Sequence, residues 1–514
     1  MFIRKRKNAS GSVTVAVVVK QDGRFKEVKI FGTATSEEEV SELFGEARHW
    51  MLLNKGQTSI DFDGERGREL EETRRVVDNV DAVLINGTQL LLGQIYDSIG
   101  FNRIPDDILR HLVIARVSQP RSKLATVEYL KSYYDEDVDL SRIYRYMDKL
   151  YKTQKDMVQQ ISVEHTRKTL GGSVGLMFYD VTTLYFETSR TDVLREPGFS
   201  KDGKTAESQV VLGLLVSEGG YPLSYSLYNG SQYEGYTMVP LIDDFRRRFN
   251  IGGDFVIVAD AGLMSANNVR LLREAGYKYV IGARIKNEKE GIREWILGWD
   301  KKDGEFIEHR RDNGERLIVG YSDARAKKDS YNRNRGVERL HKAYRSGMLT
   351  KAQVNRRGYN KFLEISKDVE VRISEDKVLE DARWDGLKGY VTNTELPADG
   401  VVSQYRGLWV VERAFRISKG TLDMRPMFHF TERRIEAHVC ICFVAYKVYK
   451  ELERIITLAG IDMSVDKVLD IAKTITTIRV KMPQNNEVYT KTLFLSERQK
   501  SIQPLFDLAG LGVL

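Results

Sequence analysis

Residues 174–181 read Val-Gly-Leu-Met-Phe-Tyr-Asp-Val, an almost continuous apolar run that reaches a single acidic residue, Asp180. Such a run predicts a strand that is buried on both faces of a sheet. Two more apolar runs follow at 209–216 and 221–228, and Glu218-Gly219-Gly220 between them is typical of a turn. The three runs therefore predict consecutive strands, the first of which ends at a carboxylate.

Beyond these strands, helix and strand patterns alternate. Residues 236–249 are amphipathic at helical spacing, and residues 255–259 read Phe-Val-Ile-Val-Ala and end at Asp260. Residues 265–275 predict a second helix, and residues 277–283 predict a further strand. The order β-β-β-α-β-α-β predicts an α/β fold with a mixed five-stranded sheet flanked by helices, which is the order of a ribonuclease-H-like fold.

The rest of the chain divides into regions of different pattern. Val13 to Val19 and Phe25 to Phe31 predict a hairpin, and Ser36 with Glu39 has the spacing of a capping box that opens a helix. We expect a small β-containing domain at 1–60, a helical domain at 61–165, a core at 170–285 and 401–460, an inserted β-rich domain at 286–400, and a C-terminal region at 461–514.

The helical domain allows two interpretations. Its short helices end in one that runs from Ser141 to Leu150 and carries Arg142, Arg145 and Lys149. A basic last helix is typical of a helix-turn-helix DNA reader. A plain helical packing domain explains the same pattern equally well.

Composition narrows the class of protein. The chain has 514 residues, of which 42% are hydrophobic and 30% charged, so it has enough apolar surface to fold as a globular protein. No stretch approaches 18 apolar residues, which argues against a membrane span. The two cysteines, Cys440 and Cys442, cannot build a disulfide framework and fit a reducing, cytoplasmic compartment.

Positive charge is concentrated in one segment. The formal net charge is +7, but Tyr321 to Lys367 alone contains 13 Lys and Arg residues against 4 Asp and Glu. This imbalance points to a polyanion partner, although a solvated charged helix would look the same. The candidate phosphate contacts are Arg325, Lys327, Lys328, Arg333 and Arg335.

Three carboxylates are candidates for chemistry. Asp180 and Asp260 follow buried strands, and the carboxyl ends of strands are where sites form in open α/β sheets. The third, Glu412, lies on a helix predicted from Gln404 to Leu422. Its predicted face contains residues at steps of four and three: Tyr405, Trp409, Glu412, Arg416 and Lys419. The structural alternatives are a helix cap for either Asp and a surface salt bridge from Glu412 to Arg416.

Three carboxylates in these positions would suit two Mg²⁺ ions. Mg²⁺ binds few carboxylates together with waters and substrate phosphate oxygens, and Mn²⁺ is a possible substitute. A pair of such ions activates a nucleophile and stabilises the leaving oxygen in phosphodiester chemistry. The pattern therefore predicts an enzyme that acts on nucleic acid.

The segments around these carboxylates resemble the DDE transposases of bacterial insertion sequences, in the group that has an insertion before the catalytic Glu. The resemblance is carried by Phe178 to Thr183, by Val258 to Gly262, and by Tyr405 to Glu412 with Phe415, Arg416 and Lys419. The last segment is similar to the family's Tyr-Arg-Glu-Lys signature. Its arginine is at Arg406, and Leu408 stands at the position expected for it.

The resemblance implies a function for the whole chain. It implies that Asp180, Asp260 and Glu412 ligate Mg²⁺ and are catalytic, and that water and then a 3′-hydroxyl attack the phosphodiester. It also implies binding to double-stranded DNA at inverted-repeat ends and target, as a homodimer, in the nucleoid of a bacterial or archaeal cell. The signature residues expected to contact DNA are Tyr405, Arg406, Trp409, Arg416 and Lys419.

A P-loop match competes with this interpretation. Gly198 to Thr205 reads Gly-Phe-Ser-Lys-Asp-Gly-Lys-Thr, which would make the protein an ATPase acting on nucleic acid. The match lacks a buried strand before it and a helix after it, both of which a phosphate cradle needs. We therefore expect Lys201 and Lys204 to lie in a loop near DNA. A DNA-binding protein that keeps the fold without catalysis is the other alternative.

Overall fold

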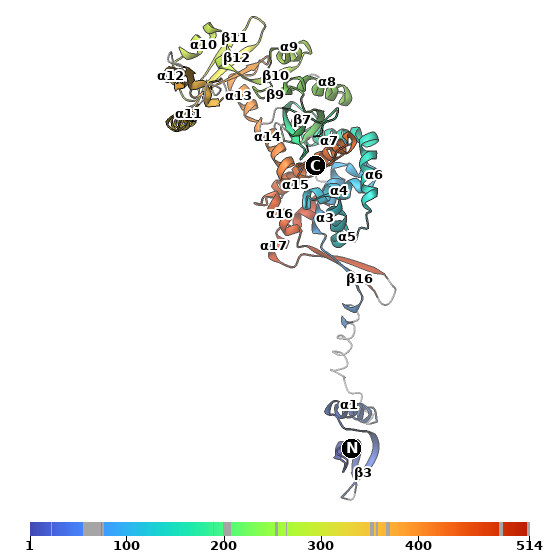
Figure 1. The fold of residues 1–514 in the computed structure, drawn as a ribbon. Coiled ribbons are helices and arrows are strands. Elements are labelled where there is room, and N and C mark those ends of the chain that lie inside the picture. The colour runs from blue at the N-terminus through green and yellow to red at the C-terminus, as the bar shows by residue number, and fades with distance from the viewer. Residues whose placement is uncertain are drawn as a thin grey trace. The chain divides into compact units, whose positions relative to one another are not determined.

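The protein is described by a computed structural model (Figure 1). The structure describes residues 1–21, 23–54, 73–74, 77–188, 190–198, 207–251, 255–263, 265–349, 354–355, 358–365, 371–482 and 487–510. The chain forms two compact units, one of Met1–Ala82 with Arg479–Thr490 and one of Val83–Ile478 with Lys491–Leu514. In the described ranges, no helix is long and apolar enough to cross a membrane.

The first unit contains an antiparallel sheet in the order β1-β2-β3 and a helix. Its elements are β1 (Phe2–Lys7), β2 (Val13–Gln21), β3 (Arg24–Ala34) and α1 (Glu37–Asn54). Val15 and Val17 pack with Val40 and Ala47, so the sheet buries one face against the helix. The predicted hairpin is confirmed, and Ser36 Oγ accepts a hydrogen bond from Glu39 N at 3.2 Å.

The helices that precede the large sheet pack around a long helix from the end of the chain. The preceding helices are α3 (Gly87–Ile99), α4 (Asp107–Ser118), α5 (Lys123–Tyr134), α6 (Leu140–Lys149) and α7 (Lys155–Thr169), and the following ones are α15 (Glu432–Leu458), α16 (Val465–Ala472), α17 (Glu497–Lys500) and α18 (Gln503–Gly510). Helix α15 contacts α3, α4, α6 and α7. Helix α6 buries Ile143, Tyr146 and Met147 and exposes Arg142, Arg145 and Lys149. Packing explains its apolar side, and the reader-helix hypothesis for its exposed side stays a prediction.

A large mixed sheet belongs to the second unit (Figure 1). In the described residues it has nine strands in the order β11-β12-β15-β10-β9-β5-β7-β6, and β8 pairs with β7. The strands are β5 (Leu176–Tyr185), β6 (Glu196–Pro197), β7 (Ser208–Ser217), β8 (Pro222–Asn229), β9 (Val256–Ala259), β10 (Lys278–Ala283), β11 (Phe306–Arg310), β12 (Arg316–Tyr321) and β15 (Leu387–Thr392). β9 is parallel to both β5 and β10, and the other pairings are antiparallel.

The prediction of five strands was therefore too low. The segment 286–400 contributes β11, β12 and β15, and β15 pairs with β10 to continue the sheet. This pairing joins residues more than 100 positions apart, which no local pattern reveals. The segment also contains α10 (Glu290–Leu297), α11 (Asp323–Arg345), α12 (Glu375–Ala382) and the small pair β13 (Leu363–Ile365) and β14 (Val371–Ile373). A third small sheet has the order β17 (Val488–Leu493), β16 (Thr476–Lys481) and β4 (Val80–Leu84).

Successive side chains of each strand point to opposite faces of the large sheet, and each face has its own core. Phe178 and Val258 belong to the core that includes α15 and the helices before it. Tyr179 and Ile257 belong to a second core with α8 (Met238–Phe249) and α9 (Ala266–Glu274). The even-numbered positions of β5 and β9, like Phe178 and Val258, therefore face the side of the sheet that packs with α15.

The predicted helix from Gln404 to Leu422 is broken. The structure has α13 (Ala398–Arg406), α14 (Trp409–Arg416) and a π-helical turn, η7 (Ile417–Thr421). A Cβ at Gly407 would lie 2.5 Å from the Phe178 ring, so only glycine fits where the two helices meet β5. The break also divides the predicted face, because Tyr405 is buried and Trp409 is 55% exposed.

Candidate active site

Asp180 and Asp260 lie side by side on the sheet. Tyr179 is the register partner of Ala259 in the parallel pair of β5 and β9, so the next residue of each strand is an aspartate. Neighbouring strands are about 4.8 Å apart. Both aspartates are at even-numbered positions, which face the side of the sheet that packs with α15. Asp180 is in the middle of β5, opposite Leu214 of β7, and not at a strand end as predicted. Asp260 directly follows β9, as predicted.

Each aspartate is oriented by a local hydrogen bond. The backbone N–H of Val181 donates to Asp180 Oδ1 at 2.8 Å, and that of Ala261 donates to Asp260 Oδ1 at 2.7 Å. These bonds engage one side of each carboxylate. The Arg284 guanidinium donates to the carbonyl of Ala261 at 3.0 Å and thereby ties the loop after Asp260 to the end of β10.

Tyr405 is a direct partner of Asp260. Its hydroxyl donates to Asp260 Oδ1 at 2.9 Å, and the residue is buried. Burial, helped by the Asp260 charge, raises the pKa of Tyr405 far above its usual value, so the hydroxyl remains a donor. A Cβ at Gly282 would lie 2.6 Å from this hydroxyl, which explains the glycine on β10. Tyr405 thus contacts Asp260 within the fold, and the predicted DNA contact from Tyr405 stays a prediction.

Lys388 on β15 completes this side of the site. Its Nζ lies 4.3 Å from the centroid of the Tyr405 ring and 5.8 Å from that of Tyr390. Burial lowers the pKa of Lys388 and the Arg325 charge lowers it further, whereas Asp260 and Glu412 act in the opposite direction. Both carboxylates are thus within electrostatic range of one ammonium group. Sequence reasoning missed Lys388 because it stands alone in a strand and belongs to no motif.

Glu412 comes from a helix that packs against the strand of Asp180. It is exposed on α14, which packs against β5 and β7. The helical segment approaches β5 at Gly407, which meets Phe178, and again at Lys419, which contacts Thr182. On β5, Asp180 lies between Phe178 and Thr182 and shares their face of the strand. On the helical segment, Glu412 lies between Gly407 and Lys419, the residues that make these two contacts.

The three carboxylates do not form a closed cluster. Within the described ranges, no group of three or more His, Cys, Asp or Glu side chains is arranged to hold a metal ion. What the structure provides is an adjacent pair, Asp180 and Asp260, with Glu412 on α14, which packs against β5. Such a pair fits Mg²⁺, which takes one or two carboxylates and completes its shell with waters and substrate phosphates.

The cations of the signature segment lie on α13, α14 and η7, the helical segment that also carries Glu412. Arg406 and Arg416 are exposed, Trp409 is exposed, and Lys419 lies 5.9 Å from the Phe415 ring centroid as well as contacting Thr182. No ion pair joins Glu412 to Arg416 in the part of the chain that the structure describes, so the salt-bridge alternative for Glu412 has no support there.

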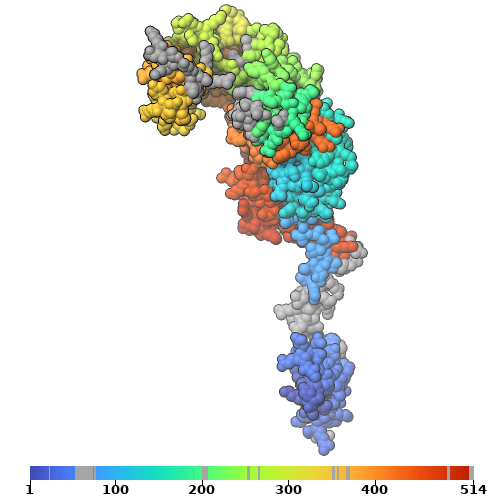
Figure 2. All heavy atoms as spheres, in the orientation of Figure 1, coloured from blue at the N-terminus to red at the C-terminus, as the bar shows by residue number. Residues whose placement is uncertain are grey.

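The predicted phosphate contacts of the basic segment lie on α11, gold in Figure 2. Arg325, Lys327, Lys328 and Arg335 are exposed, as a binding surface requires. Arg333 is only 8% exposed and forms an ion pair with Asp385. Its guanidinium is engaged within the fold, which argues against a DNA contact, and the predicted contact from Arg333 stays a prediction.

Lys201 and Lys204 lie outside the described residues, as does most of the P-loop match. The structure resumes before β7, which starts at Ser208. A strand therefore follows the match where a phosphate cradle would need a helix N-terminus.

The family of this chain follows from a comparison with models of known protein families. Residues 176–447 match the model of the transposase DDE domain, which is more than half of the sequence. The chain belongs to this transposase family. The matched region contains Asp180, Asp260 and Glu412 together with the whole of the segment 286–400. Among curated proteins, no match to the transposase sequence was found.

Solved transposase structures are only distantly similar to this transposase. The piggyBac transposase synaptic complex with hairpin DNA has 11% identity and a TM-score of 0.38, over 75% of this chain and 76% of that chain. The Mos1 transposase paired-end complex with the left transposon end has 9% identity and a TM-score of 0.16, over 34% of this chain and 58% of that one. A Mos1 mariner paired-end complex with Mn has 9% identity and a TM-score of 0.14, over 46% and 72%. The family assignment therefore rests on the sequence match.

Proposed function

We propose that this protein is a DNA transposase that binds the ends of its element, cleaves DNA and joins the 3′-hydroxyl to target DNA. The observation that carries the proposal is the register of β5 and β9, which places Asp180 beside Asp260 within the transposase domain match. We assign it to the bacterial insertion-sequence group with the Tyr-Arg-Glu-Lys signature, acting in the nucleoid of a bacterial or archaeal cell.

We also propose a ribonuclease-H-like core. The elements β5, β7, β8, α8, β9, α9 and β10 follow one another in the order that the sequence predicted, apart from the short β6. The antiparallel set β5-β7-β8 and the parallel set β5-β9-β10 share β5, so the two aspartates meet at the centre of this arrangement. This placement supports a catalytic role for both.

In the proposed mechanism, Asp180, Asp260 and Glu412 would hold divalent metal, with Mg²⁺ the expected ion and Mn²⁺ a substitute. When bound, the metal supplies activation of the attacking hydroxyl and stabilisation of the leaving oxygen. Tyr405 holds the Asp260 carboxylate in one orientation through its hydrogen bond to Oδ1 and leaves Oδ2 for a ligand role. Lys419 contacts Thr182 and holds the helical segment close to β5.

We propose that the DNA backbone is held by two groups of cations. The first group is Arg406, Arg416 and Lys419, which come with exposed Trp409 from the same helical segment as Glu412. The second group is on α11: Arg325, Lys327, Lys328 and Arg335. Lys201 and Lys204 stay predicted contacts, and we expect two copies of the chain to hold the two ends.

The test is cleavage of a duplex that carries the inverted repeats flanking the gene. Wild-type protein should nick this duplex with Mg²⁺ and not with EDTA. Asp180→Asn should lose cleavage and keep DNA binding, because it removes a metal ligand and no phosphate contact. The matched control is Glu218→Gln in the exposed turn between β7 and β8, which should cleave normally. Normal cleavage by Asp180→Asn would refute the assignment.

A non-catalytic DNA-binding protein is the second candidate. The observation in its favour is that the described residues contain no closed three-carboxylate cluster. The same assay separates the two functions, because a wild-type protein that binds the inverted repeats but never nicks them would support the second. The strand that follows Gly198 to Thr205 argues against the ATPase.

A further inference from the structure

A pocket beside Asp260 is rich in positive charge. Its volume is about 470 Å³, and its lining contains one carboxylate, Asp260, against four cations, Arg284, Lys286, Arg325 and Lys388. The cations come from the end of β10, η4 (Ile285–Asn287), α11 and β15. A concave surface with this imbalance attracts anions.

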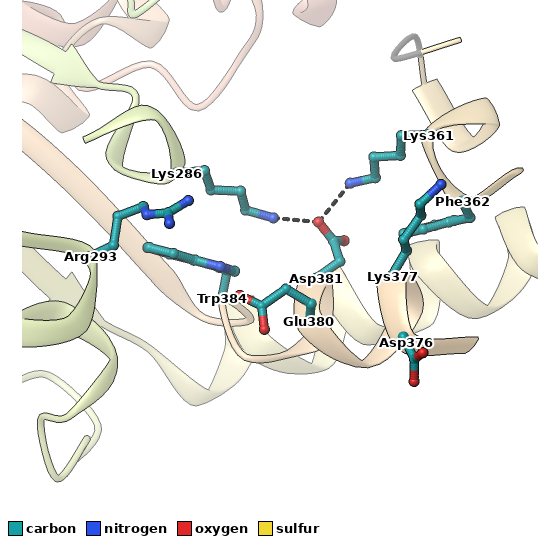
Figure 3. Close-up of a pocket in the computed structure, with 9 residues that line it drawn as sticks. All are labelled: Lys286, Arg293, Lys361, Phe362, Asp376, Lys377, Glu380, Asp381 and Trp384. Carbon is teal, nitrogen blue, oxygen red and sulfur yellow. Dashed lines mark hydrogen bonds and ion pairs between the residues drawn. The ribbon is translucent and has the colours of Figure 1, made fainter. Parts of the chain in front are cut away.

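Two of these cations already have partners that hold them in place. Arg284 donates to backbone carbonyls of the loop that follows Asp260. Lys286 also lines a second pocket, together with Lys361 and Asp381 (Figure 3). Its Nζ lies 2.7 Å from Asp381 Oδ1, and Lys361 contacts the same oxygen. Both side chains are thus already engaged within the fold.

Lys388 differs from both. No carboxylate within the described ranges lies at ion-pair distance from its ammonium, which instead sits against the rings of Tyr405 and Tyr390. Aromatic faces attract a cation but do not neutralise its charge. Arg325 has only a loose ion pair, 3.6 Å from Asp329, on a side chain that is 44% exposed. These two cations are the ones in the pocket that remain available to an anion.

We propose that Lys388, together with Arg325, binds a backbone phosphate of the DNA strand adjacent to the phosphate that is attacked at Asp180 and Asp260. The inference rests on the proposed function, because it names a contact to the DNA of that same reaction. Tyr405 links the two halves of the site: its ring supports the Lys388 ammonium and its hydroxyl holds Asp260. A phosphate in the pocket would therefore fix the strand relative to the carboxylates.

The test compares removal of the lysine with removal of the phosphate charge. Phosphates flanking the cleaved one are replaced singly by neutral methylphosphonates, and cleavage is measured for wild type and Lys388→Met, which keeps the aliphatic stem against the rings. In wild type, one replacement should lower kcat/KM by about tenfold or more, the size of a charged hydrogen bond. In Lys388→Met, the same replacement should have no further effect.

Two further variants sharpen this comparison. Lys388→Arg keeps the charge and should retain most of the sensitivity. Lys361→Ala is the matched control, because Asp381 keeps Lys286 as its partner. It should respond to each methylphosphonate as wild type does. Thermal unfolding of each variant checks that the fold is intact.

Separate outcomes overturn the inference and the proposed function. If Lys388→Met shows the wild-type sensitivity at every position, the phosphate assignment is wrong while the transposase function stands. If wild type binds the duplex but never cleaves it, the catalytic proposal fails, and the same comparison read from dissociation constants still decides whether Lys388 meets a phosphate. A wild-type protein that binds no duplex overturns both.

Discussion

The carboxylate face of the large sheet and the basic helix α11 hold their functional side chains in different ways. Asp180 lies within β5 and Asp260 directly follows β9, so the register of the two strands places them side by side. The cations of α11 extend from an exposed helix and can adapt to a partner. Function therefore depends on precise geometry at the carboxylates and on net charge at α11, so substitutions at the carboxylates should have the larger effects.

The largest effect should come from removing charge on the sheet face. Asp260→Asn and Glu412→Gln should each lower Mg²⁺-dependent cleavage by about a thousandfold or more, because a metal site that lacks one anion no longer supports the reaction. A double variant of Asp180→Asn with Asp260→Asn should be no worse than either alone, since such effects are not additive. Single-turnover cleavage rates measure this, and additive losses would contradict a shared site.

A smaller loss is expected for Tyr405→Phe, which keeps the ring and removes the donor to Asp260. Losing a partner of a metal ligand typically costs about 10- to 100-fold in metal affinity or activity. The Mg²⁺ concentration at half-maximal cleavage should rise. Tyr390→Phe is the matched control, because its ring contacts Tyr405 on the same face and its hydroxyl is not bonded to Asp260. Equal effects in the two variants would contradict the assigned role.

Gly282→Ala should affect stability and activity together. The new Cβ would lie 2.6 Å from the Tyr405 hydroxyl, so the tyrosine must shift away from Asp260. Overpacking of this kind costs about 1–3 kcal/mol of unfolding free energy. Gly291→Ala on α10 has nothing within 4 Å of its new Cβ and should be neutral or slightly stabilising. Thermal and denaturant unfolding separate these outcomes.

The smallest effects are expected on α11. Lys327→Ala, Lys328→Ala and Arg335→Ala should each weaken binding to any duplex sequence and reduce its salt dependence, with the log–log slope falling by about 0.9 for each phosphate that is no longer neutralised. Arg333→Ala should instead lower the melting temperature and leave the slope unchanged, because Arg333 is paired with Asp385 inside the fold. A slope that stays constant in all three surface variants would remove α11 from the DNA interface.

Local patterns predicted the elements that bury continuous apolar runs. The apolar runs coincide with the strands β5, β7, β8, β9 and β10. Asp260 directly follows its strand, as expected. The pairing of β15 with β10 and the helix break at Gly407 could not be predicted, because both depend on residues far away in the chain. The same holds for Lys388, whose neighbours Tyr405 and Asp260 come from other elements.

In the proposed mechanism, Asp180 and Asp260 share one divalent metal. Crystals of the protein with element-end DNA, grown with Mn²⁺, would test it through the anomalous scattering of the ion. We predict a Mn²⁺ peak in contact with a carboxylate oxygen of each aspartate, and disappearance of that peak in Asp180→Asn. A bound Mn²⁺ that contacts neither aspartate, or a peak that is unchanged in the variant, would contradict it.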